Sequence, residues 1–306
     1  MEFDNSWQGV TVPGDGTSYF EKHRGVPFDV AATRYSAINA WWLSEISRLI
    51  YRHGATRKLR KDRRQILAEV GFIEREAFDV DGTQGSIIEA APGSIHPPMA
   101  VLAFRGSEEF KDWLTNINSV PVPWEGAGLV HNGFRRGLSV VWDEIEGLLT
   151  TMTVPLFYTG HSLGAALATV AAARKAPRAT YTYGGPRVGD AHFAGIFETK
   201  QFYRVVNNRD VVPTLPPPPI FRHAGEQHYV SSAGSMLINP SLAVVETDRL
   251  RKDPTYDDHR LLIQAPQFIA DHAPVNYVAH MERLMASGDL ATPPEPRTAT
   301  PPPQSP

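Results

Sequence analysis

One short segment constrains the fold more than any other: a glycine–serine turn that joins an apolar run to an alanine-rich run. Residues 156–158 are Leu-Phe-Tyr, residues 160–164 are Gly-His-Ser-Leu-Gly, and residues 165–168 are Ala-Ala-Leu-Ala. This pattern is typical of a buried strand, a sharp turn and a helix, because glycine allows a backbone approach that leaves no room for a Cβ atom. A serine there lies at a helix amino end, where N–H groups stabilise a developing anion. Ser162 is therefore the predicted nucleophile; the plain alternative is a turn without catalytic function.

Strand and helix signals alternate along most of the chain. The expected strands are 86–90, 99–104, 155–158, 179–183 and 202–206, and the expected helices are 35–50, about 57–69, 134–148, 163–174, 191–198 and 275–285. The run 99–104 is apolar on both faces, as a central strand of a parallel sheet is. The pattern predicts an α/β fold with a mostly parallel central sheet flanked by helices.

The acid and the base of a serine hydrolase are expected to follow the nucleophile along the chain, in that order. In open α/β sheets, the side chains of binding and catalytic sites follow the carboxyl ends of strands. Asp210 closely follows the predicted strand 202–206, and the plain alternative is a turn aspartate. Five histidines come later: His223, His228, His259, His272 and His280. His272, in a loop before the last helix, is favoured, while His223 and His228 stay open as alternatives.

The segment that follows the early strand 99–104 is the predicted place of the oxyanion hole. It ends in Arg105-Gly106-Ser107, and a backbone N–H just after such a strand is an expected donor. The Ser107 hydroxyl would add to it, and the N–H of Leu163 is the expected second donor. The plain alternative for Ser107 is a turn or helix-cap serine.

A short amphipathic segment follows this strand. Phe110, Trp113, Leu114 and Ile117 fall on one helical face. A helix of this kind beside the catalytic strand is expected to cover a hydrophobic cleft as a lid. The alternative is an ordinary surface helix packed on the core.

Composition excludes several other functions. The chain has no cysteine, which excludes disulfides, cysteine-ligated zinc, iron–sulfur clusters and a cysteine nucleophile. A net charge of −3 provides no strong field for nucleic acid. No HExxH, P-loop or GxGxxG motif stands in a suitable setting, so no metal or cofactor is expected.

No apolar run reaches the length of a membrane span, which is about 20 residues. No signal peptide is visible, so a cytoplasmic or non-classically secreted protein is expected.

Two segments differ from the rest in composition. Residues 288–306 hold seven prolines and are predicted to be a disordered tail, which leaves 1–287 as a single domain. Residues 48–64 carry eight Lys or Arg and one acid. We interpret this basic run as a solvated face, with binding of anionic lipid as the alternative.

Several of these motifs together resemble the class 3 lipase family, which includes the filamentous-fungal triacylglycerol lipases. The similar blocks occur in the family's order: Val101–Asn118, Val130–Phe134, Thr159–Leu167, Tyr183–Asp190 and Tyr203–Pro217. The sequence departs from the fungal pattern in lacking the disulfide cysteines. It also places His272 five residues before Tyr277, as in the bacterial and plant form D-H-x-x-x-x-Y rather than the fungal H-x-x-Y.

The resemblance implies a single α/β-hydrolase domain with a short helical lid. Carried over by position, Ser162 is the nucleophile, Asp210 the orienting acid and His272 the base. Ser107 and Leu163 form the oxyanion hole, and Trp113 matches the lid tryptophan. The expected substrate is a lipid or other ester, including one at a lipid–water interface. Phospholipase A1, galactolipase or aryl (feruloyl-type) esterase activity, or a non-catalytic lipase-like interaction module, remain alternatives.

Overall fold

The computed structural model describes residues 3–52, 61–107, 120–126, 128–251 and 264–287. Within these residues the centre is an eight-stranded sheet in the order β1-β2-β3-β6-β7-β8-β9-β10. The strands are β1 (Phe72–Val80), β2 (Thr83–Ala90), β3 (Ala100–Phe104), β6 (Leu156–His161), β7 (Ala179–Tyr183), β8 (Phe202–Asn207), β9 (Glu226–Val230) and β10 (Met236–Ile238). The run from β3 to β9 pairs parallel, whereas β1, β2 and β10 join antiparallel at the edges. The prediction of a mostly parallel α/β sheet is confirmed.

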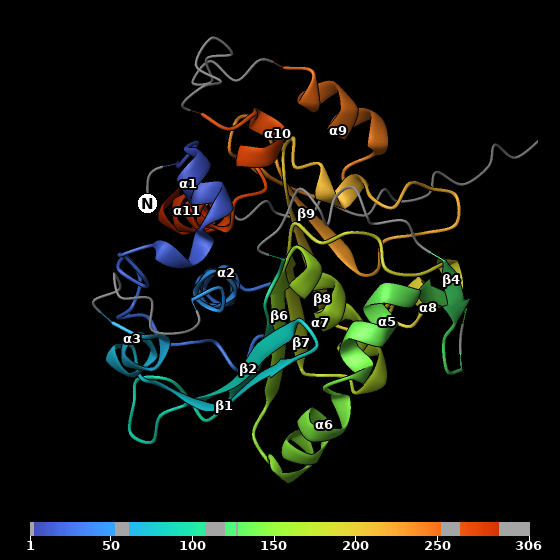
Figure 1. Cartoon of the computed structure of the whole chain (residues 1–306). Helices are drawn as coiled ribbons and strands as arrows, with labels where there is room; N and C mark the ends of the chain where they lie inside the picture. The colour runs from blue at the N-terminus through green and yellow to red at the C-terminus, as the bar shows by residue number, and fades with distance from the viewer. Residues whose placement is uncertain (1–2, 53–60, 108–119, 127, 252–263, 288–306) are drawn as a thin grey trace, which may run out of the picture.

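Helices cover both faces of this sheet (Figure 1). They are α1 (Trp7–Thr11), α2 (Ala37–Leu49), α3 (Arg63–Glu69), α5 (Asn132–Ser139), α6 (Trp142–Thr151), α7 (Leu163–Arg174), α8 (Ala191–Gly195), α9 (Leu242–Arg249), α10 (Gln267–Ala270) and α11 (Pro274–Ser287), with 3₁₀ turns η1 (Pro13–Asp15) and η2 (Val212–Thr214). A separate two-stranded sheet is formed by β4 (Pro121–Pro123) and β5 (Leu129–His131). No described helix has the length and apolar content needed to cross a bilayer.

The sheet separates two hydrophobic cores. One packs α2 and α11 against the sheet and includes Trp41, Trp42 and Met281. The other packs α5, α6 and α7 on the opposite face and includes Phe134 and Trp142. Because both faces are covered, the central strands are apolar on both sides, which explains the continuous apolar run of β3.

One predicted helix is wrong. The segment 134–148 forms two helices, α5 and α6, with the break at Val140 and Val141. Val141 has φ −119°, outside the helical range, and two adjacent β-branched residues favour helix weakly. The apolar stripe continues across the break, because Leu138 and Ile145 both stay buried.

The parallel register brings the carboxyl ends of strands β3, β6, β7 and β8 level with one another at the same end of the sheet. Phe104 of β3 is level with Gly160 of β6, and His161 of β6 is level with Tyr183 of β7. Tyr183 is level in turn with Val205 of β8. The loops that follow β3, β6, β7 and β8 therefore lie next to one another, and they carry Ser107, Ser162 and Asp210, whereas His272 comes from the later loop between α10 and α11.

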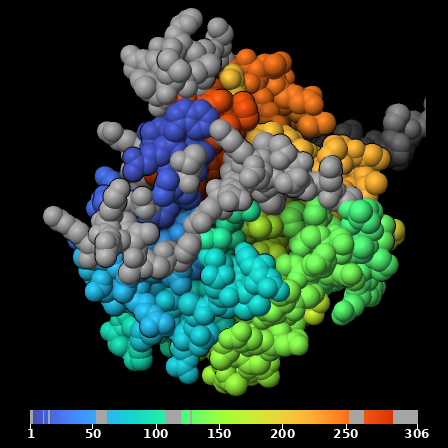
Figure 2. All heavy atoms as spheres, in the orientation of Figure 1, coloured from blue at the N-terminus to red at the C-terminus, as the bar shows by residue number. Residues whose placement is uncertain are grey.

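The first described residues, from Asp4 onward, lie beside the segment around His272, where Figure 2 shows blue atoms next to orange-red ones. The backbone N–H of Asp4 donates to Asn276 Oδ1 at 2.8 Å, and Asn276 Nδ2 donates back to the Asp4 carbonyl at 3.0 Å. Ala265 N donates to the carbonyl of Asn5 at 2.9 Å. The N-terminal segment thus contacts the chain on both sides of His272, at Ala265 and at Asn276.

The interpretation of the basic run 48–64 as a solvated face is wrong for its first part. Arg48 and Arg52 are buried, and Arg48 forms an ion pair of 2.7 Å with the buried Glu45. Arg52 donates to backbone carbonyls of Gly16 and Lys61. These cations stabilise the packing of α2 on neighbouring segments. Residues 53–60 of the run, and the predicted tail 288–306, lie outside the described residues; the single domain 1–287 stays a prediction.

We expect Glu45→Ala to lower the free energy of unfolding by about 3–5 kcal/mol, because it leaves the buried Arg48 cation uncompensated. The matched control is Glu69→Ala, which removes an exposed pair with Lys61 whose side chains are 50% and 53% exposed. That loss should be at most about 1 kcal/mol. Urea unfolding followed by circular dichroism measures both, and equal losses would contradict the prediction.

Candidate active site

The nucleophile elbow, residues 160–164, is a turn that only small residues permit. A Cβ atom added at Gly160 would lie 2.3 Å from the backbone of Gly164. A Cβ added at Gly164 would lie 2.2 Å from the carbonyl oxygen of Phe104 at the end of β3. Ser162 between them has φ 59° and ψ −125°, a strained conformation for a residue with a side chain. Its Oγ is buried and forms no hydrogen bond with the described residues.

Asp210 and His272 form a buried hydrogen-bonded pair. His272 Nδ1 lies 3.0 and 2.9 Å from the two carboxylate oxygens of Asp210. Asp210 is 0% exposed and also accepts from the N–H of Val212 at 2.8 Å. With Nδ1–H donated to the carboxylate, the neutral His272 ring has Nε2 as its basic nitrogen. The pair therefore has the arrangement of a general base oriented by an acid.

Tyr277 completes the surroundings of the carboxylate. Its hydroxyl donates to Asp210 Oδ2 at 2.5 Å and accepts from the N–H of Asn207 at 3.1 Å. Burial, and after it the charge of Asp210, raises the pKa of Tyr277 well above its ordinary value. Tyr277 therefore remains a donor to Asp210 at neutral pH.

The Asp210–His272 pair lies directly beside the end of β7. The end of β7 also contacts Ser162. The N–H of Ser162 donates to the Tyr183 carbonyl at 3.0 Å. A Cβ added at the next residue, Gly184, would lie 2.6 Å from Asp210 Oδ2 and 3.1 Å from His272 Nδ1. The structure thus brings the three predicted residues to one edge of the sheet, and their catalytic roles stay predictions.

The other described histidines have different partners. His228 Nε2 lies 2.6 Å from Glu226, and His223 Nε2 donates to the Pro213 carbonyl at 2.8 Å. His280 lies edge-on against Phe3 with ring centroids 4.5 Å apart. Burial lowers the pKa of all three, to about 3 for His280. Among the described candidates, His272 is the one paired with Asp210; His259 lies outside the described residues.

The end of β3 packs against the elbow, where the oxyanion hole is predicted. A Cβ added at Gly106 would lie 2.8 Å from the His161 carbonyl and 1.9 Å from the Tyr51 hydroxyl. Ser107 follows directly, and Leu163 is the first residue of α7, so its N–H has no acceptor within the helix. This places both predicted donor segments beside Ser162. The predicted lid residues lie outside the described residues: Phe110, Trp113, Leu114 and Ile117.

Sequence reasoning missed the residues that hold the loop of His272. Asn207 Nδ2 donates to the Asp271 carbonyl at 2.9 Å, and the N–H of Arg209 donates to the Asp271 carboxylate at 3.0 Å. Arg249 of α9 donates to the carbonyl of Asp210 at 3.1 Å. The pair Asn207-Asn208 before Asp210 was the available signal, since asparagine commonly bonds to nearby backbone.

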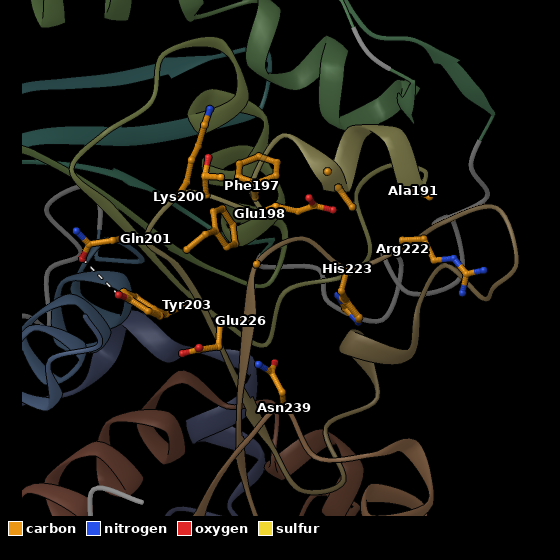
Figure 3. A pocket seen from close by; sticks show the side chains of 15 residues that line it. Ala191, Phe197, Glu198, Lys200, Gln201, Tyr203, Arg222, His223, Glu226 and Asn239 are labelled. Carbon is orange, nitrogen blue, oxygen red and sulfur yellow. Dashed lines mark hydrogen bonds between the residues drawn. The ribbon is translucent and has the colours of Figure 1, made fainter. Parts of the chain in front are cut away.

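A separate open cavity of about 690 Å³ lies at the amino ends of strands β8 and β9, at the other end of the strands from Ser162 (Figure 3). It is lined by Phe202 and Tyr203 at the start of β8, by Glu226 at the start of β9, and by His223. In open α/β sheets ligands bind beyond the carboxyl ends of strands, so this position does not favour the cavity as the active site. Within the described residues no group of three or more His, Asp or Glu is placed to hold a metal ion.

We expect Gly164→Ala to lower thermal stability and to prevent the ester hydrolysis predicted for this site, because its Cβ would meet the backbone of β3. The control is Gly147→Ala in α6, where an added Cβ meets nothing within 4 Å. That change should stabilise the helix by about 0.5–1 kcal/mol and preserve activity. Rates on a soluble ester and melting curves of both variants check this; normal activity in Gly164→Ala would show that the elbow is not tightly packed.

Comparisons with known proteins agree with this architecture. Residues 101–219 match the family described as Lipase (class 3). A lipase of Rhizomucor miehei is 32% identical over 48% of this chain and 46% of its own length. A secreted mono- and diacylglycerol lipase of Fusarium solani is 39% identical over 42% of this chain and 43% of its own. The chain thus spans less than half the length of these curated relatives.

The fold itself matches solved lipase structures. A lipase of Rhizopus microsporus var. chinensis superimposes with a TM-score of 0.53 over 71% of this chain and 83% of its own, at 22% identity. Lip2 lipase of Yarrowia lipolytica does so with a TM-score of 0.52 over 63% of this chain and 78% of its own, at 17% identity. Residues 101–219 thus match the class 3 lipase family, and this part of the chain is homologous to fungal lipases and to mono- and diacylglycerol lipases.

Proposed function

We propose that this protein hydrolyses carboxylic esters of lipids through a covalent acyl-enzyme. The observation that carries the proposal is the buried Asp210–His272 hydrogen bond, which lies at the same edge of the sheet as Ser162 in its strained turn. A serine becomes a nucleophile when a neighbouring base removes its proton, and an acid that fixes the base's tautomer makes this transfer efficient.

The proposed reaction proceeds in two halves. Ser162 Oγ attacks the ester carbonyl carbon while His272 Nε2 takes the hydroxyl proton, and the resulting oxyanion accepts hydrogen bonds at Leu163 N and at Ser107. The C–O bond of the ester then breaks, and His272 returns the proton to the departing alcohol. Water attacks the acyl-serine with the same base, releasing the carboxylic acid and regenerating Ser162. Asp210 accepts the hydrogen bond from His272 Nδ1 throughout and stabilises the imidazolium.

Glycerides are the proposed substrate class. The names of two relatives, a lipase and a secreted mono- and diacylglycerol lipase, support it. The discriminating experiment measures initial rates on four emulsified or dispersed substrates: a triacylglycerol, a diacylglycerol, a phosphatidylcholine and a galactolipid, with p-nitrophenyl esters from short to long chain. Fastest turnover of the phospholipid or the galactolipid would replace the glyceride proposal by a phospholipase A1 or galactolipase.

We expect Ser162→Ala and His272→Ala each to lower kcat on p-nitrophenyl butyrate by up to about 10⁶-fold, because nucleophile and base act as a unit. His280→Ala is the control for the base, since His280 packs on Phe3 away from Asp210. Its activity should stay near that of the unchanged protein, with circular dichroism confirming each fold. More than a few per cent residual activity in Ser162→Ala would end the assignment of the nucleophile.

The predicted lid has its own test. Trp113→Ala should reduce hydrolysis of an emulsified long-chain triacylglycerol far more than hydrolysis of a soluble short-chain ester. A short monomeric ester needs the triad and the oxyanion hole, whereas a long chain also needs an apolar cover that turns toward lipid. An equal loss on both substrates would identify the segment as structural support.

A further inference from the structure

His161, the residue before the nucleophile, connects two other parts of the site. It is buried, and its ring centroid lies 4.5 Å from that of His272. Its Nδ1 lies 2.8 Å from the hydroxyl of Tyr51, just after α2. Its Nε2 lies 2.7 Å from the backbone carbonyl of His272. The elbow thus contacts the loop of the base through a side chain as well as through packing.

These contacts define the tautomer of His161. A carbonyl oxygen only accepts, so Nε2 carries the hydrogen and donates it to His272. Nδ1 is then the acceptor, and the Tyr51 hydroxyl donates to it. Burial, and after it the neighbouring His272, lowers the pKa of His161 well below its ordinary value. His161 is therefore neutral at neutral pH, and it adds no like charge beside the ring of His272.

The carbonyl that His161 contacts is the last of three that are held in succession. The Ala270 carbonyl accepts from Asn276 Nδ2 at 2.8 Å, and the Asp271 carbonyl accepts from Asn207 Nδ2 at 2.9 Å. These donors come from α11 and β8, whereas the donor to His272 comes from the elbow itself. The His161 bond is thus the one of the three that ties the base to the segment carrying the nucleophile.

We propose that His161 is a positioning residue: Tyr51 fixes its tautomer, and its Nε2–H holds the backbone of His272 in register with Ser162. The inference rests on the proposed ester hydrolysis. One turn then supplies both the nucleophile and the anchor of its base, so a displacement of the elbow moves Ser162 and His272 together. Register of this kind matters because a misplacement of about 1 Å can cost about 100-fold in rate.

Three substitutions separate positioning from packing. In His161→Gln the side-chain amide nitrogen reaches the place of imidazole Nε2 and keeps the donor to His272. In His161→Asn the amide stops near the place of Nδ1, and in His161→Phe both polar atoms are lost. We expect kcat on p-nitrophenyl butyrate to fall about 10- to 100-fold in the Asn and Phe variants, with KM changed less than about twofold. The Gln variant should recover most of this loss.

Stability controls run beside the rates. If the role of His161 were purely structural, kcat would change only as the melting temperature changes. Gln and Asn variants of equal melting temperature would then have equal kcat, and that result would overturn the proposal. Tyr51→Phe, which removes the donor to Nδ1, should lower kcat several-fold. Its matched control is Tyr158→Phe, since the buried Tyr158 hydroxyl forms no hydrogen bond with the described residues. Equal effects of the two Tyr→Phe changes would contradict the role of Tyr51.

A spectroscopic readout is independent of catalysis. In ¹⁵N-histidine-labelled Ser162→Ala protein, with His161 assigned by its absence in a Ser162→Ala, His161→Gln double variant, we expect an Nε2–H tautomer that does not titrate around the ordinary histidine pKa of 6.5. A His161 that titrates near this value would refute the neutral anchor even if the protein is an esterase. If the unchanged protein hydrolyses no ester while His161 shows this tautomer, the proposed function fails and the hydrogen-bond assignment stands.

Discussion

The close approach of α7 to the end of β3 is the contact on which the site depends. Gly164 lies so near the Phe104 carbonyl that a Cβ would lie 2.2 Å from it. This approach forces the turn at Ser162, and it sets the first N–H groups of α7 beside the loop that follows β3. A helix dipole, a sharp buried turn and a strand end are thus combined within a few residues. A looser packing would still bury apolar surface, but it would separate the predicted oxyanion donors from the nucleophile.

The rest of the site is held by buried polar groups that satisfy one another. Asp210 accepts from His272, Tyr277 and Val212, and Tyr277 accepts in turn from Asn207. An unpaired buried carboxylate would cost several kcal/mol, so these donors stabilise the fold as well as the orientation of the base. Such networks specify one arrangement of side chains more strictly than apolar packing does, because each missing partner leaves an unsatisfied group.

Much of this was available from the sequence, and the exceptions have physical reasons. The strand–turn–helix around Ser162 was predicted because glycine, apolar and alanine-rich runs all indicate the same local structure. The antiparallel strand β1 was not, since its exposed face alternates charged residues with apolar ones, although Asp81-Gly82 is a hairpin signal. The segment 134–148 was predicted as a single helix because the helical spacing of its apolar residues continues through the break at Val140 and Val141.

The polar contacts around the base were beyond sequence reasoning for a different reason. His161, Asn207 and Asn276 are far apart in the chain, and each donates to one of three successive carbonyls. Single residues of this kind leave no periodic pattern, so only the assembled fold identifies their partners. The basic run beginning at Arg48 shows the same limit, since the distant backbone that Arg52 contacts cannot be read from local charge.

The burial of the site bears on how a substrate reaches it. Ser162, Asp210 and His272 are 1%, 0% and 4% exposed, so the proposed ester substrate would reach Ser162 only after neighbouring atoms move. Movement of His272 is disfavoured, because three side-chain hydrogen bonds and the Asp210 carboxylate hold its loop to α11, β8 and the elbow. The proposed reaction therefore requires movement of segments that carry none of Ser162, Asp210 and His272, and it leaves the Asp210–His272 pair assembled before an ester binds. A base that is already oriented needs no further reorganisation during the reaction, which is the condition under which buried dipoles stabilise a developing charge most strongly.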